Sequence, residues 1–235
     1  MGIKSKSAKV LGVLGVLIVA TALGTAADAH TATGADNALA RGAAAADAAG
    51  YIVVGPSDAQ VAGDATFYPT GPISDDTLVV IKDSDGNLPG GLTTSDLQTL
   101  VQQKRAGTLT TSADETTAPS SVVTPLTTYY SWSATSFQWS GSYAGGSLIG
   151  WDDSATATYY FRTKDATSET AAGDGIGYYR GYNGSTFGTW SSWYALGNAG
   201  TSGHTKAGIP WGNVAAVKKF EALCTTSTAC FGDFN

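Results

Sequence analysis

The chain of 235 residues carries 19 acidic and 13 basic residues, a formal net charge of −6, and its Lys and Arg residues form no large cluster. Because rows of phosphates and anionic membrane surfaces are bound by clustered positive charge, this distribution argues against nucleic acid and against a membrane surface as partners. Charged residues make up only 14% of the chain, against roughly 25% in an average soluble domain.

The first 29 residues have the three parts of an export signal. Three lysines precede an apolar run over residues 10–22, and an Ala-Asp-Ala sequence ends at Ala29. This order of parts is the pattern that signal peptidase recognises and cleaves. The apolar run is shorter than the roughly 20 residues that cross a bilayer as a helix. We therefore expect residues 1–29 to be a signal peptide cleaved after Ala29, and the mature protein to be secreted without a membrane span.

The two segments after the signal differ in apolar content. Residues 30–50 are rich in Ala and have almost nothing to bury, so we expect a disordered leader, with a frayed helix as the alternative. Residues 51–105 are acidic and contain runs of β-branched residues, which predict a small α+β segment. Such a unit is marginal alone, so it docks on the rest or serves as a propeptide. The expected strands cover residues 51–54, 65–68 and 77–82.

A helix is expected after this strand region. The sequence Ser95-Asp-Leu-Gln98 matches a capping box, in which the first and last side chains bind backbone N–H groups at the start of a helix. Lys104 and Arg105 suit its carboxyl end, because cations are favourable there. The residues expected on its buried face are Leu97, Leu100 and Val101.

Asp83, Asp85 and Asn87 place oxygen ligands on alternate residues, as at the start of a calcium-binding loop. The stretch departs from the EF-hand pattern, since position six is Leu88 where that loop has Gly. We interpret it as an Asp-Gly turn and keep these three residues as a weak calcium candidate. No other metal site and no cofactor is predicted, because the sequence contains no further ligand motif and no glycine-rich phosphate loop.

The chain changes character after residues 106–126. That stretch is rich in Thr and Ser and contains two Pro, which is typical of a linker. Of the 24 aromatic residues, 21 lie after residue 128. We expect residues 127–235 to form an aromatic-rich β domain of their own.

Short alternating strands fill this β domain. Residues 156–162 alternate in character, and Asn183-Gly184 is the strongest hairpin signal in the chain, between strands expected over 175–182 and 186–196. Six or seven short strands in about 100 residues, separated by Gly, are typical of an antiparallel sandwich. The predicted fold class is mainly β, an antiparallel β-sandwich of jelly-roll or immunoglobulin-like type preceded by the small α+β segment.

Residues 214–223 fit two structures. Asn213 could cap a helix, and helix propensity favours that interpretation. Alternation of Val214, Lys218 and Phe220 with their neighbours fits a strand equally well. The surrounding strands favour the strand, which is our prediction.

The two cysteines of the chain are Cys224 and Cys230. In an exported protein an even pair of cysteines indicates a disulfide. The ring that it closes is small, so we expect a gain of only about 2–2.5 kcal/mol from the restricted unfolded chain.

Aromatic side chains supply the candidate binding site. Trp190 and Trp193 lie on one arm of the predicted hairpin, and Tyr179 and Tyr182 lie on the other. An exposed flat ring can stack on a sugar or on an aromatic partner. We therefore expect a secreted, non-catalytic protein that binds an extracellular glycan, a cell-wall polymer or another protein. The competing interpretation is that these rings fill a core that has few Leu, Ile and Val residues.

Two other functions stay open. The first is a secreted antibacterial or inhibitory protein whose acidic N-terminal half is a propeptide. The second is a secreted glycan hydrolase that uses Asp152, Asp153 or Glu221, because glycoside hydrolysis requires a pair of carboxyl groups. The sequence contains no serine-nucleophile or zinc-protease motif, which favours the non-catalytic interpretation.

Overall fold

The protein is described here from a computed structural model. The described residues are 34–63, 65–109, 122–123, 128–164, 171–183, 186–226 and 228–235, without the side chains of 34–37, 39, 122–123, 176–183 and 186–187. The predicted signal peptide and most of the predicted linker lie outside these ranges. Within them, no helix is long and apolar enough to cross a membrane.

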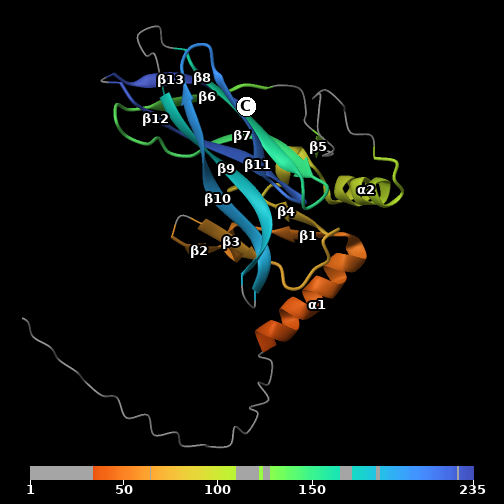
Figure 1. The fold of residues 1–235 in the computed structure, drawn as a ribbon. Coiled ribbons are helices and arrows are strands. Elements are labelled where there is room, and N and C mark those ends of the chain that lie inside the picture. Colours follow the sequence, from red (N-terminus) through yellow and green to blue (C-terminus); the bar gives the residue numbers. More distant parts are fainter. Residues whose placement is uncertain are drawn as a thin grey trace, which may run out of the picture. The chain divides into compact units, whose positions relative to one another are not determined.

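Most of the described chain is β-structure in two sheets (Figure 1). Sheet A contains β1 (Tyr51–Val54), β2 (Gln60–Ala62), β3 (Ala65–Pro69), β4 (Leu78–Ile81), β5 (Val122–Val123), β7 (Tyr143–Gly150), β9 (Ala171–Asn183), β10 (Thr186–Ala199) and β12 (Val214–Cys224). Its strand order is β1-β4-β12-β9-β10-β3-β2, with β7 paired to β12 and β5 paired to β7. Sheet A is mixed. β4 runs parallel to both β1 and β12, whereas all other strand pairs of the sheet are antiparallel.

Sheet B contains β6 (Tyr130–Ala134), β8 (Thr156–Thr163), β11 (His204–Pro210) and β13 (Cys230–Phe234). The strand order is β11-β8-β13-β6, and all three pairs are antiparallel. Alternation along the sequence becomes alternation of faces: in β8, Tyr159 and Phe161 are fully buried while Tyr160 and Arg162 are partly exposed on the other side.

The two sheets meet in a shared aromatic core. Phe220 of β12 stacks on Phe234 of β13 with ring centroids 4.7 Å apart, and Phe161 of β8 lies 5.3 Å from Phe220. Trp132 and Trp211 are buried in the same cluster. Aromatic residues therefore supply much of the buried apolar area that Leu and Ile supply in other cores, because each aromatic side chain is large.

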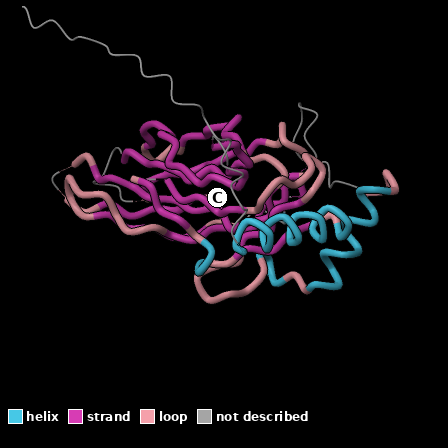
Figure 2. Tube along the Cα trace, turned by 90° about the horizontal axis from the view of Figure 1, so that it is seen from below, coloured by secondary structure: helices cyan, strands magenta, loops and turns pink. Residues whose placement is uncertain are grey.

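Helix α1 (Gly34–Ala49) occupies the Ala-rich stretch that we predicted as a disordered leader. Ala43 and Ala46 are buried, and one carboxylate oxygen of Asp47 accepts hydrogen bonds from the Ser74 N–H and the Thr77 hydroxyl. Packing of this kind explains the difference from the prediction, because tertiary contacts stabilise helices that are marginal alone. Figure 2 shows the helical segments on one side of the strands.

Helix α2 (Thr94–Arg105) is the predicted helix, with Leu97 and Val101 buried as expected. The predicted capping box begins two residues too late, at Ser95, whereas the capping residue in the structure is Thr93. Thr93 accepts a hydrogen bond from the Asp96 N–H, and the Asp96 carboxylate binds the Thr93 N–H in return. The earlier box prevails because its acidic member is also favourable at a helix amino end. The remaining helical turns are η1 (Pro56–Asp58) and η2 (Pro89–Gly91).

The acidic α+β segment and the aromatic-rich segment share sheet A. β4 pairs with β12 through Val79 and Val80, and β3 pairs with β10 through residues 66–69. All four residues of β4 are buried. Leu78 and Val80 pack in a second core cluster with Leu97 of α2, Ile149 and Trp151. Residues 51–105 therefore contribute strands and core to the same structural unit as residues 128–235.

Three element-level predictions are confirmed. Residues 214–223 lie in strand β12, the predicted hairpin forms β9 and β10, and Cys224 is bonded to Cys230. The mainly β fold class is also confirmed. The purely antiparallel arrangement applies to the strand pairs formed within residues 130–234, whereas β4 adds parallel pairing.

Candidate binding face

The predicted aromatic site on the hairpin is only partly brought together. Trp190 lies opposite Tyr179 in the β9–β10 register and opposite Phe67 in the β3–β10 register. Its ring centroid is 4.8 Å from that of the buried Phe67. Trp193 is half-buried and packs against the main core cluster. The side chains of Tyr179 and Tyr182 lie outside the described residues, so their part in a binding face stays a prediction.

The exposed aromatic rings lie elsewhere. Among the described side chains, the exposed large aromatic residues come from the position just before β6, from the loop after β6, and from β13. They are Tyr129, Phe137, Trp139 and Phe231, with exposed fractions of 49%, 68%, 47% and 50%. The sequence shows that this region is rich in aromatics, but alternation alone does not reveal which face of β6 and β13 is turned to solvent.

The outer face of sheet B places two of these rings, Tyr129 and Phe231, in an ordered array of side chains, which we call the sheet B platform. Phe231 lies between Ser133 of β6 and Lys164, whose N–H donates to the Phe231 carbonyl. In the next row Asp233 lies between Ser131 and Arg162. The third row is formed by Tyr129, Asn235 and Tyr160, with Asn235 and Tyr160 exchanging two backbone hydrogen bonds.

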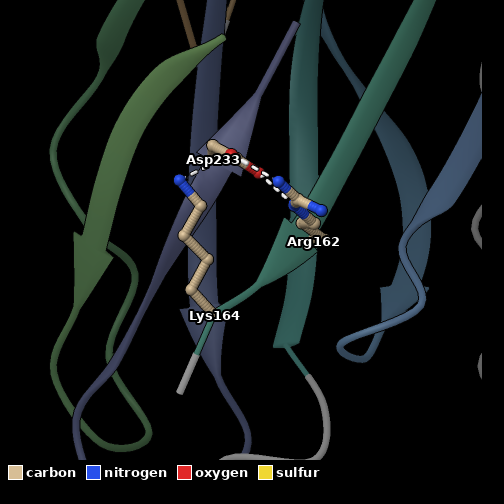
Figure 3. A network of polar contacts seen from close by, with 3 residues as sticks. All are labelled: Arg162, Lys164 and Asp233. Carbon is tan, nitrogen blue, oxygen red and sulfur yellow. Dashed lines mark hydrogen bonds and ion pairs between the residues drawn. The ribbon is translucent and has the colours of Figure 1, made fainter. Parts of the chain in front are cut away.

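A charged network occupies the middle of the sheet B platform (Figure 3). Arg162 binds Asp233 through two parallel contacts, Nε to Oδ1 at 2.7 Å and Nη2 to Oδ2 at 3.1 Å. Lys164 Nζ lies 2.7 Å from Oδ2 of the same carboxylate. The Asp233 side chain is 3% exposed, whereas those of Arg162 and Lys164 are 39% and 45% exposed. One buried carboxylate therefore positions two cations at the surface.

The network shifts the titration of its members. Burial raises the pKa of Asp233, but its hydrogen bonds and its attraction to Arg162 and Lys164 outweigh this effect and hold the pKa below the ordinary value. Hydrogen bonding to Asp233 raises the pKa of Arg162. Arg162 also lies over the Tyr129 ring, 5.8 Å from its centroid, and Tyr129 contacts Tyr160 edge to face at 5.7 Å. The charged and aromatic parts of the platform are thus in direct contact.

A shallow groove adjoins the platform at Ser133. Its lining comes from residues 133–135 and 139–141 together with Ala229, so hydroxyl groups and the Trp139 ring share one depression. The loop above it is tied to the disulfide strand: the Phe137 N–H donates to the Cys224 carbonyl. Phe137 has φ of 53°, a conformation that is costly for a bulky residue and clusters at functional positions.

The weak calcium candidate, residues 83–87, forms a hydrogen-bonded turn. Asp83 Oδ1 accepts hydrogen bonds from the backbone N–H groups of Asp85 and Asn87, and the Asn87 amide donates to Oδ2. These bonds, led by the one from the Asn87 N–H, lower the pKa of Asp83. Both carboxylate oxygens of Asp83 therefore already accept hydrogen bonds within the turn. Among the described residues, no group of three or more His, Cys, Asp and Glu side chains is arranged to hold a metal ion.

The carboxylates considered for hydrolysis fall into two places. Asp152 accepts hydrogen bonds from the N–H and hydroxyl of Ser154, as in a turn, and the exposed Asp153 follows it. Glu221 of β12 lies directly opposite Asp174 of β9. Burial raises the pKa of both, and the negative charge of Asp174 raises that of Glu221 further. The groove at Trp139 contains none of these carboxylates.

Comparison of the chain with family models, with curated proteins and with solved structures finds no match.

Proposed function

We propose that this protein is a secreted, non-catalytic glycan-binding protein, built as a two-sheet β-sandwich whose sheet B platform holds the ligand. The observation that carries the proposal is that the exposed aromatic rings, among the side chains that the structure describes, gather in one region. Tyr129 and Phe231 lie at opposite ends of the platform, and Trp139 lines the adjoining groove. Exposed rings gathered on one surface are the usual means of stacking on sugar faces.

Polar groups between the rings support the same function. Ser131 and Ser133 are exposed on the platform, and the Ser133 hydroxyl also contacts that of Tyr143. Hydroxyl groups both donate and accept hydrogen bonds, which matches the hydroxyl-rich edges of a sugar. The platform is part of a regular sheet, so these groups are presented by a rigid scaffold with little ordering cost on binding.

The experiment that tests the proposal is affinity electrophoresis of the mature protein in gels that contain different bacterial and plant polysaccharides. Phe231→Ala is expected to weaken retardation by about tenfold in affinity, the equivalent of ~1.4 kcal/mol for one lost stacking contact. Because Phe231 is half exposed, the variant keeps the fold, which near-ultraviolet circular dichroism verifies.

The matched control is Val61→Ala, which trims an apolar side chain that is 76% exposed on β2. It is expected to leave retardation unchanged. Equal affinity of wild type and Phe231→Ala for every retarding polysaccharide would contradict the proposed site. Absence of retardation by every polysaccharide, with capture of a protein instead, would contradict glycan binding itself.

A further inference from the structure

The charged centre of the sheet B platform indicates the class of glycan. We infer that the ligand is an anionic polysaccharide, whose negative groups bind Arg162 and Lys164 while its sugar rings stack on the aromatic ends. This inference rests on the proposed function and adds the charge and the length of the ligand.

Arg162 and Lys164 keep N–H donors that Asp233 does not use. Asp233 occupies Nε and Nη2 of Arg162 and one donor direction of Lys164 Nζ. A guanidinium has five N–H donors and an ammonium has three, so both groups keep donors that an incoming carboxylate or phosphate can accept from. Their side chains are 39% and 45% exposed, which leaves those donors open to a ligand.

Charge complementarity supports the same inference. The side chains of the described platform residues include two cations and one carboxylate, and that carboxylate is 3% exposed. A ligand therefore meets mainly the cations. This is unusual for a chain with a formal net charge of −6, in which repulsion would otherwise disfavour an anionic partner. Asp233 holds the two cations in place, so little side-chain entropy is lost when an anion binds.

The two aromatic rings at the ends of the platform, those of Tyr129 and Phe231, are too far apart for one sugar to contact both. Tyr129 lies just before β6 and four residues before Ser133, and Phe231 lies opposite Ser133. The two ends are therefore separated by roughly 14 Å along the strand. A single sugar reaches one end only, whereas a chain of several sugars reaches both and crosses Arg162 between them. The platform thus favours a polymer over a monosaccharide.

The test uses the full mature protein and three polymers in affinity gels: polygalacturonate, a glycerol-phosphate teichoic acid and a neutral glucan. We expect the anionic polymers to retard the protein more than the glucan, and added sodium chloride to weaken the retardation. Preference for polygalacturonate identifies a carboxylate as the recognised group, and preference for the teichoic acid identifies a phosphate. Galacturonic acid monomer is expected to compete poorly with polygalacturonate.

The decisive variant is Lys164→Gln, which leaves Arg162 paired with Asp233. It is expected to lower the affinity for the preferred anionic polymer by up to roughly fivefold, as for loss of one exposed charge contact. The matched control is Lys206→Gln on β11 of the same sheet, another exposed lysine that lies away from the platform. Equal losses in the two variants would show non-specific charge attraction and would overturn the inference.

Two further outcomes separate this inference from the proposed function. Equal retardation by the neutral glucan and by both anionic polymers, with loss of binding in Phe231→Ala, overturns the anionic ligand and keeps glycan binding. Absence of retardation by all three polymers and by the wider panel of polysaccharides overturns both.

Discussion

At the scale of single residues, Asp233 is the residue that holds the two cations of the sheet B platform in place. Its buried carboxylate is held by three contacts to Arg162 and Lys164. We expect Asp233→Asn to lower the free energy of unfolding by about 1–3 kcal/mol at neutral pH, the range for hydrogen bonds to charged groups. Because the pKa of Asp233 is lowered on folding, its ionised form stabilises the protein above the ordinary Asp value near 3.9, and this stability is lost as pH falls through the lower folded value.

Urea unfolding measured from about pH 7 down to about pH 3 tests this expectation. The difference between wild type and Asp233→Asn should shrink toward the acid end, and the difference between wild type and Phe231→Ala, which alters no ionisable group, should show no such change. A constant difference across the range would contradict the role given to the charge. Asp174 and Glu221 act in the opposite sense, because a carboxyl whose pKa is raised on folding costs stability as pH rises through its folded value.

At the scale of elements, β13 fits between β6 and β8 because Gly232 has no side chain. A Cβ atom at this position would lie 1.8 Å from the Arg162 carbonyl oxygen and 2.8 Å from the Trp132 ring. We therefore expect Gly232→Ala to force the strands apart and to destabilise the protein by about 1–3 kcal/mol or more, as overpacking does. Chemical denaturation measures the loss. The matched control is Gly141→Ala, where a Cβ atom meets nothing within 4 Å; a similar loss in both variants would contradict the packing argument.

The elements also show what the sequence could predict. Runs of β-branched residues and alternation located β1, β4, β8 and the β9–β10 hairpin, since these signals are local. β13 was missed because Cys230–Phe234 contains Gly and Asp and becomes a strand only between two partners. Helix α1 was predicted only as the alternative to a disordered leader, because its stability comes from packing of small Ala side chains.

Aromatic richness after residue 128 directs attention to this half of the chain, but it does not indicate the sheet B platform. Trp190 and Trp193 were chosen for their place on the predicted hairpin, and their part in binding stays a prediction. The sheet B platform depends on Phe231 and Asp233 pairing with strands about 70 and 100 residues earlier in the chain. Pairing at such separation is decided by the whole fold, so no local pattern identifies the platform.

At the scale of the whole molecule, the acidic segment cannot be detached without exposing core. β4 is buried throughout and pairs with β12, and Ile149 and Trp151 pack in a cluster with residues of β4 and α2. We expect residues 128–235 expressed alone to lack a cooperative unfolding transition, and co-expression with residues 34–109 to restore it, because an unpaired strand edge and an uncovered apolar face are both unfavourable.

Tryptophan fluorescence during urea unfolding is the measurement, and the intact chain is its control. Cooperative unfolding of residues 128–235 alone, with the midpoint of the intact protein, would contradict this expectation and would favour a removable propeptide. Cleavage between the segments in the native protein is expected to leave the two pieces associated.

The Tyr143 hydroxyl has a consequence for solubility. It accepts a hydrogen bond from the Ser133 N–H and donates to the Ser133 carbonyl, on the strand that closes sheet B. An unoccupied strand edge is a template on which another molecule can add a strand and begin an aggregate. Tyr143 fills one position of that template with a side chain from the opposite sheet. Addition of a strand from another copy at this position therefore requires displacement of the Tyr143 hydroxyl from both backbone groups of Ser133.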